Sequence, residues 1–110
     1  MARYLGTIDV TTEGFRGMVS SPENRQEANA ALFRSLGYEL EHYWYGVGGS
    51  TIYVVYSSET DDDVNGQSLI MAVCASGIVN KMTSVRIIDA EAGKAAAEKA
   101  ATILYRPPGG

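Results

Sequence analysis

The stretch YELEHYWYGVGGSTIYVVYS, residues 38–57, decides the fold, because it predicts two β-strands joined by a glycine-rich turn. Successive side chains of a strand point to opposite faces, and the period-two pattern of residues 38–47 predicts the first strand. Residues 51–57 are rich in Val, Ile, Tyr and Thr, which predicts the second strand. The glycines between them favour a tight turn, so the two strands form a hairpin.

Outside the hairpin, the pattern of apolar residues predicts two further strands, at residues 3–10 and 82–88. It also predicts helices that begin at polar caps or acidic residues. These helices cover residues 13–19, 22–36, 60–76 and 90–105. The order is strand, helix, strand, strand, helix, strand and an extra C-terminal helix. This order is typical of an α+β, ferredoxin-like split βαβ fold, with a four-stranded antiparallel sheet that has helices on one face.

Length and charge limit the classes of protein that the chain can belong to. Its 110 residues suit one domain, expected at residues 1–106, with a flexible tail at residues 107–110. The formal net charge is −4 and the basic residues are scattered, so we expect no binding to nucleic acid. No run of about 18 apolar residues exists, so no membrane span is expected. Asp9 interrupts the N-terminal segment before any stretch typical of a signal peptide, which favours the cytoplasm.

A series of short motifs runs along the chain in a fixed order. They are YL at 4–5, TEGFRGM at 12–18, SLG at 35–37, LE at 40–41, YWY at 43–45, Gly48, AVCASGIV at 72–79 and Thr83. Taken together, these motifs resemble the GYD-domain family, which consists of small proteins of the dimeric α/β-barrel type. The Gly-Tyr-Asp element that names the family is replaced here by Gly49-Ser50-Thr51. The resemblance implies a fold and a dimer, and it implies no activity.

The bare face of the expected sheet gives a separate physical reason for a dimer. Glu39 and Glu41 would be costly against the helices, so their face of the strand, which also carries Tyr43 and Tyr45, is assigned to the outside. Monomers rarely expose large contiguous apolar patches. We therefore expect a homodimer, or a higher oligomer, that packs sheet to sheet with Tyr43 and Tyr45 at the interface.

The opposite face of the same strand carries Leu40, His42 and Trp44 and is assigned to the helix side. Related dimeric barrels that are enzymes have a pocket between the sheet and its helices, so the resemblance implies that His42 and Trp44 line one. His42 is the only histidine, and its ordinary pKa near neutrality suits ligand binding or proton transfer. The alternative is a histidine with satisfied hydrogen bonds at the edge of the core. The neighbouring aromatic residues can stack on a flat ligand or fill a core and an interface.

Three motifs that suggest other chemistry have simpler interpretations. Asp61, Asp63, Asn65 and Gly66 match the first half of a calcium loop, but Ala72 occupies the position that needs a bidentate Glu. These acidic residues are therefore expected to form a charged first turn of a helix. The glycine-rich turn leads into a strand and not into a helix N-terminus, so it does not predict a phosphate site.

Cys74 is the only cysteine, which excludes an intrachain disulfide and a site made of several thiolates. Its apolar neighbours predict an inert buried side chain and not a nucleophile. No metal site and no cofactor are expected.

The sequence thus favours a protein of unassigned biochemical role that binds a small apolar or aromatic molecule or assembles with itself. The alternative is a cofactor-free monooxygenase-like or isomerase-like enzyme with a pocket near His42. The enzyme requires a closed cavity that contains His42 and a second polar group, whereas binding requires only an apolar groove.

Overall fold

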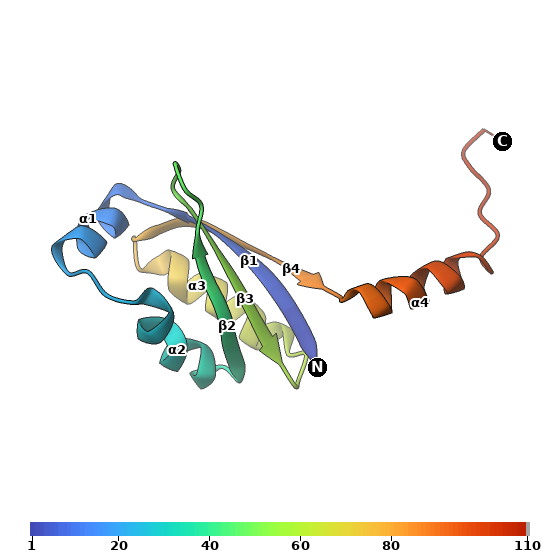
Figure 1. The fold of residues 1–110 in the computed structure, drawn as a ribbon, viewed down its shortest axis with the longest axis horizontal. Helices are drawn as coiled ribbons and strands as arrows, with labels where there is room; N and C mark the ends of the chain where they lie inside the picture. The colour runs from blue at the N-terminus through green and yellow to red at the C-terminus, as the bar shows by residue number, and fades with distance from the viewer. Residues whose placement is uncertain (110) are drawn as a thin grey trace.

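A computed structural model describes residues 1–109 and contains one four-stranded antiparallel sheet (Figure 1). The elements follow the chain as β1 (Ala2–Val10), α1 (Thr12–Ser20), α2 (Arg25–Ser35), β2 (Tyr38–Tyr45), β3 (Thr51–Ser58), α3 (Asp63–Ala75), β4 (Val79–Ile87) and α4 (Ala90–Ala100). The strands lie in the order β2-β3-β1-β4, and the sheet is open. The α+β ferredoxin-like fold predicted from the sequence is confirmed.

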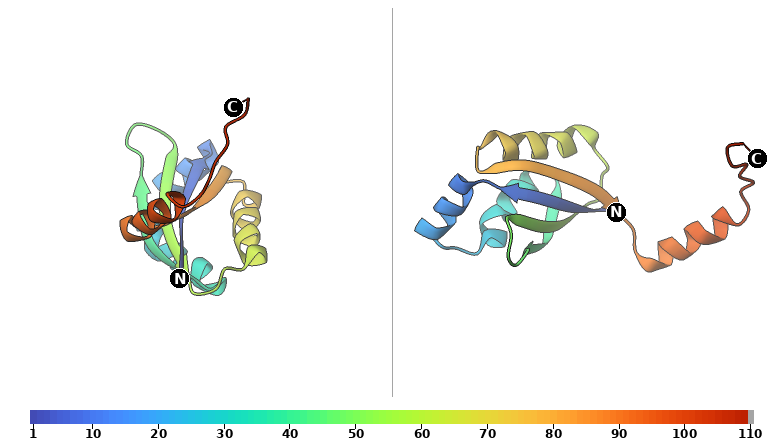
Figure 2. Two further views of the ribbon diagram at one scale, coloured as in Figure 1. Left: turned by 90° about the vertical axis from the view of Figure 1, so that its right-hand side faces the viewer. Right: turned by 90° about the horizontal axis from the view of Figure 1, so that it is seen from above.

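Helices α2 and α3 cover one face of the sheet, with α2 packed along β2 and α3 along β4, and α1 lies at one end of the sheet (Figures 1 and 2). The layer between them is filled by alternate residues of the strands, because side chains two positions apart share a face. Ile52 and Val54 of β3 and Leu69 of α3 are the largest fully buried side chains. Phe33 of α2 and Met82 of β4 complete the same core.

Helix α1 is fixed against the loop that leads into β4. Thr11 caps the helix by accepting a hydrogen bond from the Gly14 amide at 3.1 Å, and its hydroxyl donates to the carbonyl of Gly77 at 3.0 Å. A Cβ atom added at Gly14 would lie 2.5 Å from the carbonyl oxygen of Ile78. Only glycine therefore permits this approach of helix to loop.

A β-bulge in β2 changes the direction of its side chains. Leu40 lies opposite Tyr56 of β3, but His42 lies opposite Val55, so Glu41 is an extra residue. A shift of one residue exchanges the two faces of a strand. Beyond the bulge, Tyr43 therefore points to the helix side.

The boundaries of several elements differ from those expected, and α3 begins at Asp63 and β4 at Val79. Helix α2 begins at Arg25, after the cap Asn24, and not at residue 22, because the Asn24 side chain accepts from the Glu27 amide at 3.2 Å. Helix α4 ends at Ala100, contains no buried residue and extends away from the sheet (Figures 1 and 2). In the described part of the chain, no helix has the length and apolar character needed to cross a bilayer.

Candidate functional site

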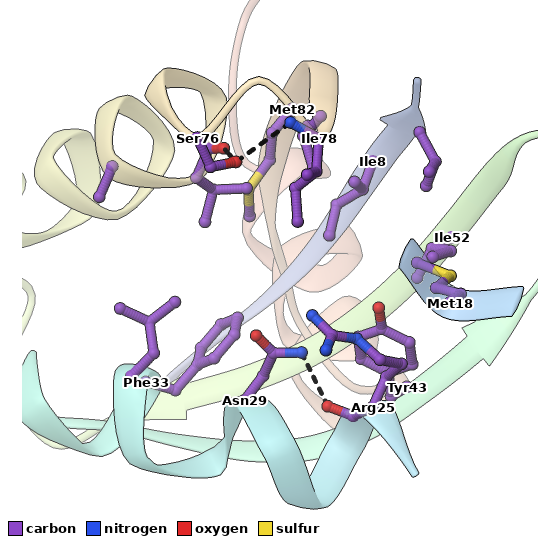
Figure 3. Close-up of a pocket in the computed structure, with 15 residues that line it drawn as sticks. Ile8, Met18, Arg25, Asn29, Phe33, Tyr43, Ile52, Ser76, Ile78 and Met82 are labelled. Atoms are coloured by element: carbon purple, nitrogen blue, oxygen red, sulfur yellow. Dashed lines mark hydrogen bonds between the residues drawn. The ribbon is translucent and has the colours of Figure 1, made fainter. Parts of the chain in front are cut away.

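A cavity of about 240 Å³ lies between the sheet and helices α1, α2 and α3 (Figure 3). Most of its wall is apolar. The apolar lining consists of Ile8, Val10, Met18, Leu32, Phe33, Ile52, Ala72, Val73, Ile78, Val79 and Met82. This volume is just below the range of about 300–1,000 Å³ that is typical of ligand pockets, so the space suits a small molecule.

The polar part of the lining includes three side chains from two adjacent elements, Arg25 and Asn29 of α2 and Tyr43 of β2 (Figure 3). The Asn29 side-chain amide donates to the carbonyl oxygen of Arg25 at 2.7 Å, which fixes the amide at the cavity wall. A fourth polar residue, Ser76, follows α3, and its hydroxyl donates to the carbonyl of Val73 at 2.6 Å. Its hydrogen bond is therefore already made within the chain.

The guanidinium of Arg25 is only partly satisfied by the protein. Its Nη1 atom lies 2.5 Å from the Oε1 atom of Glu23. Its Nε atom is buried and has no hydrogen-bond partner, the only such case recorded for a side chain in residues 1–109. A buried donor without a partner costs about 1–3 kcal/mol, and more when it is charged. Such groups are rare in proteins and call for an explanation.

The protonation states of these groups follow from their surroundings. Burial acts to lower the pKa of Arg25, but the hydrogen bond to Glu23 and the neighbouring Tyr43 raise it above its ordinary value. Burial raises the pKa of the Tyr43 hydroxyl, and the nearby Arg25 guanidinium opposes only part of this shift. At neutral pH the polar side of the cavity therefore presents one cation and one neutral hydroxyl.

The bulge places the residues selected from the sequence on the faces opposite to those expected. His42 and Trp44 point to the open face, where their rings stack with centroids 4.6 Å apart and an interplanar angle of 17°. Tyr43 lines the cavity, and the Tyr45 hydroxyl lies 3.9 Å from the sulfur of Met18, on the helix side. The face assignment is therefore corrected, since alternation was counted through Glu41 without a break.

The sequence interpretation did not select Arg25 and Asn29. A signal was present, because Arg25, Asn29 and Phe33 lie four residues apart and so share one face of α2. Phe33 is almost fully buried, so the polar residues at the same spacing also face inward.

A second cluster of polar side chains lies on the same face of the sheet. The Tyr4 hydroxyl donates to the Asp61 carboxylate, which also pairs with Arg86 at 3.2 Å. This hydrogen bond to Asp61 raises the pKa of Tyr4 to about 12. The hydroxyl of Tyr56 forms a hydrogen bond with that of Ser84, so the hydroxyls of Tyr4 and Tyr56 both have partners within the protein.

The acidic segment that resembled half of a calcium loop serves as the start of α3. Asp62 is the N-cap, and its carboxylate accepts from the amides of Val64 and Asn65 at 2.9 and 3.1 Å. Across residues 1–109, His, Cys, Asp and Glu side chains form no group of three or more that could hold a metal ion. Cys74 is half-buried and packs against the core.

The open face of the sheet carries a mixture of aromatic, aliphatic and charged groups. Trp44 and Tyr53 are 53% and 39% exposed, and Val85 of β4 is also exposed. Beside them, Arg3 and Glu41 form a two-pronged ion pair with distances of 2.6 and 3.0 Å. This hydrogen bonding to Arg3 holds the pKa of Glu41 below its ordinary value.

Comparison with known proteins gives one finding. The family described as GYD domain matches residues 4–97, which is most of the chain. No curated protein matches this chain.

Proposed function

The chain belongs to the GYD domain family, and on this premise we propose that it binds a small, largely apolar molecule in the cavity between the sheet and helices α1, α2 and α3. The observation that carries the proposal is a mainly apolar cavity whose lining includes the Arg25 guanidinium beside the Tyr43 hydroxyl. Apolar pockets with a few converging polar groups are typical of ligand sites.

Methionine methyl groups offer a direct test of this proposal. Met18 and Met82 line the cavity, whereas Met1 and Met71 are exposed and do not line it. With indole as a neutral aromatic probe, NMR of ¹³C-methyl methionine should show saturable shifts at Met18 and Met82. Saturable shifts confined to Met1 or Met71, or no shifts, would contradict binding in the cavity.

A pair of substitutions on α3 provides the control. Ala72 lines the cavity, whereas Ala75 lies three residues further along the helix and does not line it. Ala72→Leu should fill part of the space and weaken indole binding at least tenfold, which corresponds to about 1.4 kcal/mol. Ala75→Leu should leave the affinity unchanged. Equal affinities in both variants would place the probe elsewhere.

A second candidate function is self-association through the open face of the sheet, with a second copy of the chain as the partner. The exposed Trp44, Tyr53 and Val85 favour it, because no helix covers them. Arg3 pairs with Glu41 on the same face, so two identical faces can approach without strong like-charge repulsion. Tyr43 and Tyr45, which point to the helix side, have no part in this interface.

Light scattering at micromolar concentration tests the dimer. The wild-type protein should have the mass of a dimer, and Trp44→Glu should have the mass of a monomer, because it places a carboxylate in the interface. Tyr105→Glu, at an exposed site after α4, is the matched control and should remain dimeric. A monomeric wild-type protein would remove this candidate.

The enzyme alternative, a cofactor-free monooxygenase or isomerase, has less support. General acid–base catalysis needs a group whose pKa lies near the working pH. The ionisable groups of the cavity lining are Arg25 and Tyr43, and both have pKa values raised further above neutrality. His42 lies on the opposite face of the sheet. Binding without chemistry therefore agrees better with the lining of the cavity.

A further inference from the structure

We propose that the molecule bound in the cavity is a small monocarboxylic acid, whose carboxylate accepts hydrogen bonds from the Arg25 guanidinium while its apolar body lies among Phe33, Ile52 and Met82. This inference rests on the proposed function, because it names the chemical class of ligand for the same cavity. The position of Arg25 in the cavity lining and the charges around it support this inference.

The first step concerns the two sides of the Arg25 guanidinium. The Glu23 carboxylate pairs with the Nη1 atom of Arg25 and is half-exposed, so this ion pair lies on the solvent side of the guanidinium. The Nε atom is closed off even from a water-sized group, so a ligand in the cavity, which Arg25 lines, meets the guanidinium at its Nη atoms. A guanidinium can bind two acceptors at separate edges, because its five N–H groups form a fixed fork. The protein supplies the acceptor for one edge, and we assign the acceptor for the other edge to the ligand.

The charges of the cavity lining favour an anionic ligand. Arg25 is the only charged side chain in the lining, which contains no Asp, Glu, Lys or His. The neutral Tyr43 hydroxyl, whose pKa is raised by burial, is a second donor beside it. Hydrogen bonds in which donor and acceptor are both charged are roughly twice as strong as neutral ones. An anionic oxygen is therefore favoured over the neutral oxygen of an amide or an alcohol.

The third step limits the number of charges on the ligand. A phosphate or a dicarboxylate carries about two charges at neutral pH and needs several cations or many donors. The cavity offers one guanidinium, already paired with Glu23 on its outer edge, and the rest of its wall is mainly apolar. One carboxylate on an apolar body matches this distribution. The cavity volume of about 240 Å³ keeps that body small.

A second crevice adjoins the cavity and offers a route into it. This smaller crevice lies between α1 and the start of α2, and Glu13, Ser21 and Glu23 contribute to its lining. Met18, Arg25 and Ile78 line both this crevice and the cavity, so they form the boundary between the two spaces. The crevice carries the carboxylates of Glu13 and Glu23 as well as the Arg25 guanidinium, so a ligand that enters here meets charges of both signs.

The test compares phenylacetate with phenylacetamide, two probes that share one shape and differ in charge. In the wild-type protein, methyl shifts of Met18 and Met82 should report phenylacetate binding at least tenfold tighter than that of phenylacetamide. Arg25→Met should abolish this preference, because it keeps an apolar stem and removes the guanidinium. Arg34→Met, in the last turn of α2 and outside the cavity lining, is the matched control and should keep it.

The ¹⁵N signal of the Arg25 Nε–H gives a second readout that requires no folded variant. It should move on addition of phenylacetate and stay in place with phenylacetamide. If both probes shift Met18 and Met82 with equal affinity, the carboxylate inference fails and the proposed function stands. If neither probe shifts these two methyl groups and indole also fails to shift them, both fail. A preference for phenylacetate that survives in Arg25→Met overturns the role of Arg25.

Discussion

The helix-covered face of the sheet has two regions, each with a pocket, that differ in how their polar groups are paired. In the tyrosine cluster, the rings of Tyr4, Tyr38 and Tyr56 pack at centroid distances of 5.0 to 6.2 Å. The hydroxyls of Tyr4 and Tyr56 have hydrogen-bond partners within the protein. In the cavity region, an apolar space remains open and the Nε atom of Arg25 has no partner.

This difference indicates where a small domain can bind another molecule. A region whose polar groups are all satisfied within the chain contributes to stability without a ligand. A region whose wall carries a cation gains stability when an anionic ligand binds there. Four predictions test this contrast.

The largest effect is expected in the tyrosine cluster. Tyr56 is 2% exposed and contacts three other aromatic rings, so Tyr56→Ala should lower the free energy of unfolding by about 3–5 kcal/mol through lost packing. Urea denaturation measures the change. Tyr105→Ala, at an exposed position, should cost less than about 0.5 kcal/mol. A small loss at Tyr56 would mean that the cluster is not tightly packed.

The second prediction concerns the wall of the cavity formed by α1. Gly14→Ala should lower the free energy of unfolding by about 1–3 kcal/mol, because the new methyl group would collide with the carbonyl of Ile78. Gly17 lies on the same helix with no atom near its missing Cβ. Gly17→Ala should therefore raise stability by about 0.5–1 kcal/mol in the same denaturation experiment. Effects of equal sign would show that α1 is not held against this loop.

The third prediction compares one polar group from each region in the absence of ligand. Tyr4→Phe should lower stability by about 0.5–1.5 kcal/mol, because it removes the hydrogen bond to Asp61. Arg25→Met should leave stability unchanged or raise it, since it removes a buried donor that lacks a partner. Thermal unfolding of the two variants measures both changes. A loss of stability in Arg25→Met as large as that in Tyr4→Phe would contradict the contrast.

The smallest effect is a pH dependence. The pKa of Tyr4 is raised to about 12 by the hydrogen bond to Asp61, from about 10 for an unfolded tyrosine. The folded protein thus favours the protonated phenol, and the stability from this bond is fully present below pH 10 and is lost as the pH rises through about 12. Titration of the tyrosines by ultraviolet absorbance should show one late ionisation fewer in Tyr4→Phe than in the wild-type protein. Identical titration curves for the two proteins would contradict the bond.

The sequence allowed most of the fold to be predicted, and the reason is local. Residues 38–57 combine β-forming side chains with a glycine-rich turn, and these signals act within a few residues. The GYD resemblance found in the motifs agrees with the family match over residues 4–97. The order of strands and helices then left few topologies to consider.

The site was predicted less well, because it depends on two features that are not local. The bulge at Glu41 is visible only once β2 is paired with β3, and it moves His42 to the open face and Tyr43 to the cavity. Whether the Arg25 Nε atom finds a hydrogen-bond partner depends on how the strands and α3 pack beside α2. The alternation of side chains along a single strand does not reveal either feature.

The most direct test of the account is to locate phenylacetate on the protein by nuclear Overhauser effects from its ring protons. The account predicts contacts with the methyl groups of Met18 and Met82, which line the cavity. Contacts only with the exposed Met71 or with the ring of Trp44 would contradict it, since they would place the ligand on the outer surface or on the open face of the sheet.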